Sequence, residues 1–389
     1  MARIVCVLYE DPTGGHPLVY ARDGVPRIEL YPDGQTIPSP AAVDFRSGEL
    51  LGDVTGALGL RSFLEARGHT LIVTADRDGP NSVFDQELPE ADIVISQACW
   101  PACLTSERIA KAPKLRLVIT AGVGSNHIDL AAAASHDITV TEITSSASIS
   151  AAEYAVMLIL SVVHNAVPSS LPGARFDRNI GDYARRAYDL EGMHVGSVGA
   201  GRSGFALLRR LRPFDVRLHY TDPRRLPLAV ENELGLTYHP TTAIMVPACD
   251  VVTIHCPLHA ETVRLFDTDM IGRMKRGAYL INTAQDGICD PDAVAHALET
   301  GRLAGYAADT RSTLSPAGTP IHVAGATLAA QARYAAGTRE VLESWFAGVS
   351  IRDDYLIVDR GTLTAVGRRS YGMDRRAHAQ PLHGRPTLL

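Results

Sequence analysis

The sequence predicts an α/β protein made of two mainly parallel sheets, each covered by helices. Short apolar segments alternate with amphipathic ones along most of the chain, which is typical of successive βαβ units. The chain has 389 residues, more than a single hydrophobic core normally serves, so two domains are expected. A glycine-rich turn near the middle of the chain indicates where the second sheet begins.

The first part of the chain contains five predicted strands and three predicted helices. The strands are the apolar segments 4–9, 70–75, 93–97, 115–121 and 139–143. The helices are the stretches 58–66, 105–111 and 129–135. Residues 11–53 are rich in Pro, Gly and Asp and are expected to form a long extended insertion.

The second part starts with a helix from residue 151 to about 165, which is apolar on nearly every side and is expected to be buried. Strands are predicted at 194–198, 216–220, 251–255, 278–282 and 304–309, and helices at 202–211 and 291–299. A final helix over 327–346 returns the chain to the first domain. We therefore expect residues 1–150 and 335–389 to form one domain and residues 151–334 the other. The tail beyond Gly361, rich in arginine, is either flexible or laid over another surface.

Composition restricts the class of protein. Charged residues make up 21% and apolar residues 46%, as in soluble globular proteins, and the net charge of −6 gives no electrostatic case for nucleic-acid binding. The longest apolar run, 155–163, is too short to cross a bilayer, and no signal peptide is visible. The six cysteines lack metal-ligand spacing and are interpreted as mostly buried free thiols. These features predict a cytoplasmic protein with no metal and no membrane partner.

The most informative motif is Gly199-x-Gly201-x-x-Gly204, between an apolar strand and a helix. In such a turn the first glycine makes the bend, the second lets the backbone approach a pyrophosphate, and the third lets the helix pack on the strand. The helix N-terminus offers free N–H groups to phosphates. The next strand ends at Asp222, which would accept hydrogen bonds from an adenosine ribose and repel a 2′-phosphate. The motif therefore predicts a dinucleotide site that favours NAD over NADP.

Long segments of the chain resemble one family. They are Tyr-Ala-Arg-Asp (20–23), Trp-Pro-Ala (100–102), Glu-Arg-Ile-Ala-Lys-Ala-Pro-Lys-Leu (107–115), Tyr-Asp-Leu-Glu-Gly-Met-His-Val-Gly (188–196), Leu-His-Tyr-Thr-Asp (218–222), Cys-Pro-Leu-His (256–259), Gly-Arg-Leu-Ala-Gly-Tyr-Ala (301–307) and Gln-Ala-Arg-Tyr-Ala-Ala-Gly-Thr-Arg-Glu (331–340). Up to about residue 360 the chain resembles the NAD-dependent, metal-free formate dehydrogenases, a branch of the D-2-hydroxyacid dehydrogenases. The resemblance implies two Rossmann-like domains, a flavodoxin-like substrate domain and an NAD-binding Rossmann domain, with a cleft between them. It also implies a homodimer, joined through the helix from Ala151 and the segment 179–188.

The resemblance also implies a set of cofactor residues. The phosphate turn comprises Gly199, Gly201, Arg202, Ser203 and Gly204, and Asp222 binds the ribose. Pro257, Leu258, His259 and Glu261 line the adenine side, while Thr283 follows a strand of the nucleotide domain. Asp309 and Gly325 hold the nicotinamide carboxamide, with Ala324 where the family has serine. Ser148, His322 and Ser370, the last in a closing segment, complete the set.

The substrate side departs from the family. The candidate residues there are His322, Gln285, Ala147 and Val123. Of the groups that act on formate in the family, only His322 remains, and the loop from 309 to 322 is shorter than the family's. Gln285 stands where the family has Arg, Ala147 where it has Asn, and Ala98-Cys99 where it has Pro-Phe, while the Gln partner of the histidine has no counterpart.

These replacements bear directly on formate. Gln285 is neutral and lacks the charged fork of a guanidinium, and Asp286 beside it adds a negative charge. Losing a charged clamp on an anion costs on the order of 2–5 kcal/mol, or tens- to thousands-fold in affinity. We therefore expect formate oxidation to be absent or vestigial.

Two interpretations of the altered site remain open beside residual formate dehydrogenase activity. In the first, the chain is a dehydrogenase for a neutral, polar or cationic small molecule, with His322 exchanging the proton. Arg311 and Arg333 are then candidate replacement anchors, although a lone Arg in a loop is more often a solvated surface charge. In the second, the chain binds NAD without dehydrogenase turnover. The first interpretation is favoured.

Overall fold

The computed structural model describes residues 1–8, 60–97, 101–166, 187–309, 323–325 and 327–371. The chain divides into two compact units. Unit 1 comprises residues 1–146 and 331–389, and unit 2 comprises residues 147–330. The sequence placed these boundaries at 150 and 334. Unit 2 is thus an insertion in unit 1. The predicted long insertion, residues 11–53, lies outside the described residues.

Unit 1 is built on a seven-stranded sheet in the order β13-β12-β5-β4-β3-β1-β2. The five strands β1 to β5 are parallel, in the order 2-1-3-4-5 seen in flavodoxin-like folds. They are β1 (Arg3–Val7), β2 (Thr70–Thr74), β3 (Ile93–Ser96), β4 (Leu117–Thr120) and β5 (Thr139–Glu142). The last part of the chain adds β12 (Leu356–Asp359), antiparallel to β5, and β13 (Thr362–Leu363).

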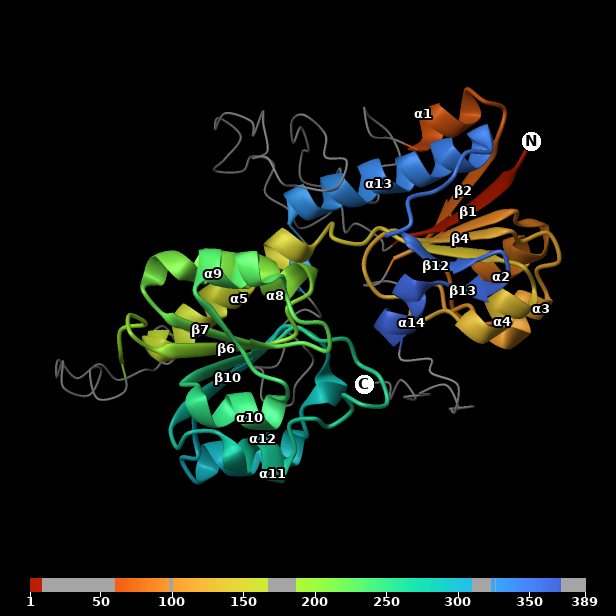
Figure 1. The fold of residues 1–389 in the computed structure, drawn as a ribbon. Helices are drawn as coiled ribbons and strands as arrows, with labels where there is room; N and C mark the ends of the chain where they lie inside the picture. Colours follow the sequence, from red (N-terminus) through yellow and green to blue (C-terminus); the bar gives the residue numbers. More distant parts are fainter. Residues whose placement is uncertain (9–59, 98–100, 167–186, 310–322, 326, 372–389) are drawn as a thin grey trace, which may run out of the picture. The chain divides into compact units, whose positions relative to one another are not determined.

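Six α-helices of unit 1 cover its sheet in the part of the chain that the structure describes. They are α1 (Leu60–Glu65), α2 (Val83–Glu87), α3 (Ser106–Ala110), α4 (Leu130–Ser135), α13 (Leu328–Ala347) and α14 (Ala365–Tyr371), with the 3₁₀ turn η1 (Leu88–Glu90) following α2. Figure 1 shows α13 beside α1, and α2, α3, α4 and α14 over the other face. Ser82, Thr105 and Asp129 cap the N-termini of α2, α3 and α4 through their side-chain oxygens.

Unit 2 is built on a six-stranded parallel sheet in the order β11-β10-β9-β6-β7-β8. Its strands are β6 (His194–Val198), β7 (Arg217–Thr221), β8 (Leu236–Tyr238), β9 (Val251–Ile254), β10 (Ala278–Asn282) and β11 (Leu303–Ala308). This strand order is that of the Rossmann fold. From β6 the chain first adds strands on one side of the sheet (β7, β8) and then on the other (β9, β10, β11), so the switch point lies between β6 and β9. In such sheets ligands bind at the carboxyl ends of the strands beside this switch point. The predicted α/β class with two Rossmann-like sheets is confirmed.

Helices lie on both faces of the second sheet (Figure 1). One face carries α5 (Ser148–Val163), α8 (Arg202–Leu211) and α9 (Leu228–Leu234). The other carries α10 (Thr242–Met245), α11 (Thr268–Arg273) and α12 (Pro291–Glu299). The 3₁₀ turns are η2 (Arg212–Phe214), η3 (Val246–Ala248), η4 (Asp286–Ile288) and η5 (Val323–Gly325). The predicted burial of α5 holds for one side only, where Ala152, Ala155, Ile159 and Val163 are fully buried, while Met157 is 46% exposed.

The tail beyond Gly361 is in part folded onto unit 1. Leu363, Val366 and Tyr371 pack against the core of that unit, so the interpretation of a tail laid over a surface holds for residues 362–371. Residues 372–389 lie outside the described part. None of the described helices is both long and apolar enough to cross a membrane.

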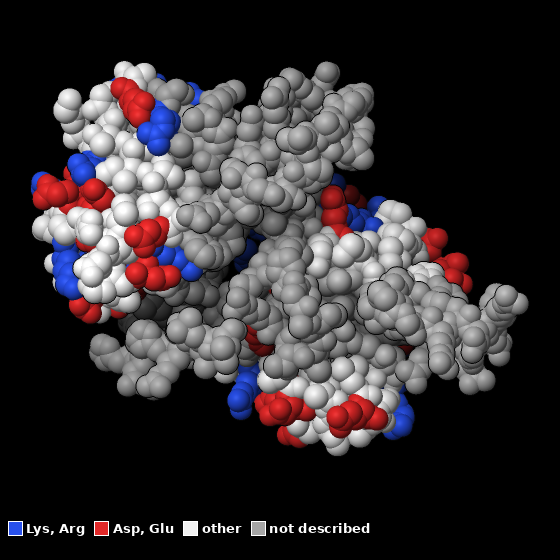
Figure 2. Space-filling view, turned by 180° about the vertical axis from the view of Figure 1, so that it is seen from behind, with Lys and Arg blue, Asp and Glu red and all other residues white. Residues whose placement is uncertain are grey.

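The surface of the described residues mixes the two signs of charge. On the face shown in Figure 2, acidic and basic side chains lie side by side over both units. Many are ion-paired with a neighbour, as in Lys111 with Glu107 and Arg339 with Glu343. Such exposed pairs contribute little to stability.

Candidate nucleotide site of unit 2

The glycine turn lies at the switch point of the second sheet. Gly199 follows β6 with φ +96°, a conformation that an L side chain rarely adopts. A Cβ at this position would lie 2.9 Å from the carbonyl carbon and oxygen of His255, which follows β9. The main chains after β6 and β9 therefore approach each other so closely that only glycine fits at residue 199.

The other two glycines of the motif have different surroundings. A Cβ at Gly204 would collide with the carbonyl oxygen of Gly199, so this glycine lets α8 pack against the turn. A Cβ at Gly201 would meet no atom within 4 Å. The space in front of Gly201 is therefore open, as the approach of a pyrophosphate requires.

The N-terminus of α8, like those of α5 and α9, has no side-chain cap. Its N-cap is Gly201, which makes no side-chain hydrogen bond to the first turn. By contrast, Asp267 and Asp290 cap α11 and α12 with their carboxylates. The first N–H groups of α8 are thus left without a side-chain cap and can donate to an anion, with support from the helix dipole.

Asp222 stands beside this turn, directly after β7. One carboxylate oxygen accepts from the Ala200 N–H at 2.9 Å and the other from the Arg224 N–H at 2.8 Å. The carboxylate is half-buried, and each of its oxygens has a second lone pair for another donor. Asp222 is therefore held in one orientation and can still accept hydrogen bonds from two hydroxyl groups.

His255 is a residue of this site that sequence reasoning missed. Its Nε2 lies 2.8 Å from the Thr253 hydroxyl and its Nδ1 lies 3.5 Å from the Thr283 hydroxyl. Burial lowers the pKa of His255 to about 4, so the ring is neutral at pH 7. The alternation of a strand places Thr253 and His255 on one face, and this was the available signal.

The carboxyl ends of β10 and β11 carry further predicted residues. Asp309 is 4% exposed, and its carboxylate accepts from the Ala324 N–H at 3.0 Å, which ties the end of β11 to η5 and Gly325. At the end of β10, the Asn282 side chain donates to the Gln285 carbonyl at 3.0 Å and accepts from the Ala284 N–H at 3.0 Å. The buried Asn282 amide therefore shapes the turn that presents Gln285.

The two residues at the predicted clamp positions lie at the starts of helical segments. Gln285 is half-buried and immediately precedes η4, whose first residue, Asp286, is exposed. Ala147 immediately precedes α5 and makes no side-chain cap. Ser148, the first residue of α5, is 9% exposed.

The predicted adenine-side loop follows β9. Leu258 packs against Gly287, while Pro257 and Glu261 are exposed. The loop is closed by the Thr262 hydroxyl, which donates to the Pro257 carbonyl at 2.6 Å. His259 is half-buried and its Nδ1 accepts from the Glu261 N–H at 3.2 Å.

Three predicted residues belong to unit 1. Val123, after β4, is 45% exposed, and Ser370 lies half-buried on α14. Arg333 lies on α13, is 1% exposed, and its Nε donates to the Ser146 carbonyl at 2.7 Å. Its interpretation as a solvated charge in a loop is therefore wrong, because the side chain is buried against the chain just before Ala147.

Some predicted residues lie outside the described part of the chain. They are His322, Arg311, Ala98 and Cys99. Of the cysteines, Cys6, Cys249 and Cys289 are buried free thiols, Cys256 is half-buried and Cys103 is exposed. The described residues contain no group of three or more His, Cys, Asp or Glu side chains arranged to hold a metal ion.

Comparisons with known proteins agree with this geometry. The family model for the D-isomer specific 2-hydroxyacid dehydrogenase, NAD binding domain, matches residues 156–322. The chain is 56% identical over 382 residues to the formate dehydrogenase of Pseudomonas sp. (strain 101), with 95% of each chain covered. It is 43% identical over 354 residues to the formate dehydrogenase of Neurospora crassa, with 85% of this chain and 93% of that one covered. The chain belongs to the formate dehydrogenase family.

Solved structures of this formate dehydrogenase family have the same fold. The Granulicella m. formate dehydrogenase matches with a TM-score of 0.83 and 56% identity, covering 94% of this chain and 100% of that one. The NAD-dependent formate dehydrogenase of Staphylococcus aureus in complex with NAD matches with a TM-score of 0.72 and 34% identity, covering 92% and 99%. The predicted resemblance is confirmed.

NAD is the cofactor of this formate dehydrogenase family member, because the matched domain is an NAD-binding one. The residues of unit 2 fit such a group. The turn offers open space at Gly201, the start of α8 offers N–H donors, and Asp222 offers free lone pairs beside them. The chain is thus an NAD-dependent oxidoreductase of the formate dehydrogenase type.

Proposed function

We propose that this chain oxidises or reduces a small molecule other than formate, with NAD as its redox partner. The observation that carries the proposal is the pair Gln285 and Ala147, at the positions where the family motifs have Arg and Asn. A formate site has little to act on except a negative charge, so the loss of both clamping groups removes most of its binding energy.

The chain's own residues favour a neutral or cationic substrate. The Gln285 amide can donate to one uncharged oxygen and accept from one N–H or O–H group. Asp286 directly follows it and is exposed, so its carboxylate repels an anion approaching that turn. The methyl side chain of Ala147 leaves room that an amide would fill. We assign to His322 the role of holding or taking the substrate proton.

The cofactor roles are also part of the proposal. When bound, NAD supplies the hydride acceptor or donor. The first turn of α8 binds its pyrophosphate, and Asp222 binds the adenosine ribose. Asp309 and Gly325 hold the carboxamide of the nicotinamide ring, and the loop 257–261 lines the adenine. Thr283 and the neutral His255 line the nucleotide site at the carboxyl ends of β9 and β10.

A substrate screen tests the proposal. NADH absorbance is followed with NAD and a panel of formate, primary alcohols, 2-hydroxy acids and amino alcohols, and the reverse direction is followed with NADH and the matching carbonyl compounds. We expect turnover with an uncharged or cationic member and none, or a vestigial rate, with formate. Formate oxidation at a rate normal for the family would overturn the proposal.

Calorimetric titration with NAD accompanies the screen. Tight binding of NAD without turnover of any panel member would instead favour a protein that binds the dinucleotide without using it in redox chemistry. The same two altered residues motivate this second candidate, because they remove substrate-binding groups and leave the glycine turn intact.

We propose a homodimer as the assembly, through α5. Met157 on this helix is 46% exposed, and Tyr188, at the end of the predicted interface segment, is 58% exposed. Met157→Glu would place a charge in such an interface. The mass measured by light scattering should fall from twice the chain mass to the chain mass, and an unchanged mass would contradict this interface.

A further inference from the structure

Residues 222–227, here named the ribose loop, connect β7 to α9 and carry Asp222. Pro223, Arg224 and Arg225 in this loop are exposed. Asp222 fixes the start of the loop through the Ala200 and Arg224 N–H groups. A different set of side chains fixes its other end.

That set is centred on Glu231 of α9, which is only 4% exposed. Arg225 donates to its two carboxylate oxygens through Nε at 2.8 Å and Nη2 at 2.7 Å. The Tyr220 hydroxyl donates to the same carboxylate at 2.5 Å. A buried carboxylate that accepts three such bonds is held firmly, because charge-assisted hydrogen bonds are the strong ones.

Tyr220 connects this carboxylate back to the loop. The residue is fully buried in β7, two positions before Asp222, and its hydroxyl accepts from the Leu226 N–H at 2.9 Å. The Arg225 guanidinium also lies over the Tyr238 ring, 5.0 Å from the centroid. Strand, loop and helix are therefore joined at one point, at the end of the ribose loop that leads into α9.

The arrangement also controls charge near the ribose. Two arginines follow Asp222 in the ribose loop, and a guanidinium is the group best suited to bind a 2′-phosphate. Glu231 binds Arg225 by both nitrogens of one edge and so neutralises one of these two cations. Releasing Arg225 would add a mobile positive charge next to Asp222.

We propose that Glu231 is a positioning residue that holds the ribose loop for NAD and keeps Arg225 from supporting NADP. It touches neither cofactor nor substrate, and it acts through Arg225, Tyr220 and Leu226. The inference rests on the proposed ribose role of Asp222 and is independent of which substrate the chain uses.

Calorimetric titration of the full chain with NAD and with NADP tests this proposal. Glu231→Gln should raise the Kd for NAD about tenfold, because charge-assisted hydrogen bonds of the loop are lost. The same variant should lower the ratio of the Kd for NADP to the Kd for NAD. If Glu231 contributed only to the stability of the fold, the variant would not change this ratio of Kd values.

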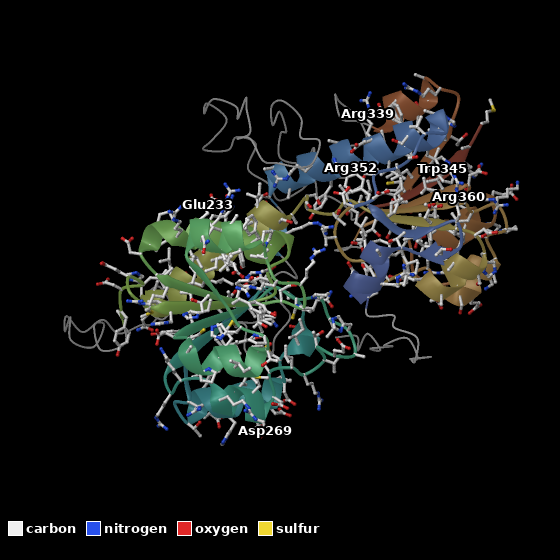
Figure 3. All side chains as sticks on the ribbon, in the orientation of Figure 1. Glu233, Asp269, Arg339, Trp345, Arg352 and Arg360 are labelled. Carbon is white, nitrogen blue, oxygen red and sulfur yellow. The ribbon has the colours of Figure 1, made fainter. Side chains whose placement is uncertain are left out.

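Glu233 provides the matched control. It lies on the same helix and is exposed (Figure 3). Its carboxylate forms no ion pair with any residue that the structure describes. Glu233→Gln removes the same charge and should leave both Kd values unchanged. If Glu231→Gln does not fold, Arg225→Lys serves instead, since it keeps the charge but loses the fork, and it should shift the ratio in the same direction.

Two outcomes separate the proposals. Asp222→Asn should weaken NAD binding, and an unchanged Kd in that variant would refute the ribose role itself. If Asp222→Asn weakens binding while folded Glu231→Gln and Arg225→Lys both retain the wild-type Kd values and ratio, the positioning role of Glu231 is refuted.

Discussion

His194 and His219 are hydrogen-bonded ring to ring, with Nδ1 of His194 2.8 Å from Nε2 of His219. The contact continues to His239, directly after β8, where Nδ1 of His219 lies 3.0 Å from Nε2 of His239. In each contact one nitrogen must lack a proton to accept, so two neighbouring rings of this row cannot both be doubly protonated. Lys275 and Asp250, which pair at 2.7 Å, are the nearby charges.

This row predicts acid sensitivity. Burial, followed by the charges of His194 and His239, lowers the pKa of His219 to about 4. The unfolded chain takes up this proton near pH 6.5, so stability is fully present above that pH and is lost as the pH falls toward 4. His255, with a pKa also lowered to about 4, acts in the same sense. The free energy of unfolding, measured in urea between pH 7 and 4, should fall by up to about 1.4 kcal/mol per pH unit for each histidine.

Replacing His219, the central ring of the row, measures how much this residue contributes to the pH dependence of the free energy of unfolding. His219→Asn should flatten the pH dependence by the amount due to one group, whereas His136→Asn, at an exposed position at the end of α4, should leave it unchanged. An equal slope in the wild type and the His219 variant would count against the assignment.

The glycine turn predicts two different outcomes for the same substitution. Gly201→Ala places a methyl group in open space, so the melting temperature should not change. NAD affinity should fall at least about tenfold, because the methyl group occupies the space that the pyrophosphate needs. Gly204→Ala presses on the Gly199 carbonyl and should lower the free energy of unfolding by about 1–3 kcal/mol. Thermal melts and NAD titration of both variants check the pair, and unaltered NAD affinity in Gly201→Ala would remove the turn from the cofactor site.

The proposed loss of the formate clamp predicts a gain of function. The double variant Gln285→Arg with Ala147→Asn should raise kcat/KM for formate by roughly 30- to 1000-fold, since a charged clamp on an anion contributes about 2–4 kcal/mol. Gln285→Lys is the control for charge alone and should gain less, because an ammonium lacks the bidentate fork. Steady-state kinetics with NAD and formate measure all three proteins. No gain in the folded double variant would contradict the proposal that Gln285 and Ala147 prevent formate oxidation.

The last described helix predicts a stability effect in unit 1. The Tyr371 hydroxyl donates to the buried Glu142 carboxylate and accepts from the Ser125 N–H at 2.5 Å. Tyr371→Phe leaves the Glu142 carboxylate with one donor fewer and should lower the free energy of unfolding by about 1–3 kcal/mol in urea titration. Tyr188→Phe, at a ring that is 58% exposed, should change it little. A Tyr371 variant as stable as the wild type would mean that α14 contributes nothing through this contact.

Sequence reasoning located the elements around the glycine motif well. The predicted bounds of β6, β10, α8 and α12 equal the observed ones, because apolar strands next to glycine, proline and acidic caps leave little choice of boundary. Strands β12 and β13 and helix α14 escaped prediction. Leu356 and Val358 pair with Thr141 and Val140 of a strand far earlier in the chain, and such long-range pairing leaves no local pattern.

The sequence was sufficient to predict the residues of the glycine motif. It was not sufficient to predict the neighbouring residues that hold the site in place. Gly199, Gly201 and Asp222 follow from spacing alone. The role of His255 depends on Thr283 from the neighbouring strand, which only the folded sheet brings within reach. Glu231 and Glu233 are alike in the sequence, two positions apart on one helix, and only the fold shows that the first is buried against Tyr220 and Arg225.

The insertion of unit 2 within unit 1 has a consequence for biosynthesis. All six strands of the second sheet leave the ribosome before β12 is translated, so unit 2 can fold first although unit 1 begins the chain. Until then β5 has an unpaired edge at Val140 and Thr141, and open edges invite association with other nascent chains. Arrest of translation just before Leu356 would therefore leave a complete second sheet attached to an incomplete first one.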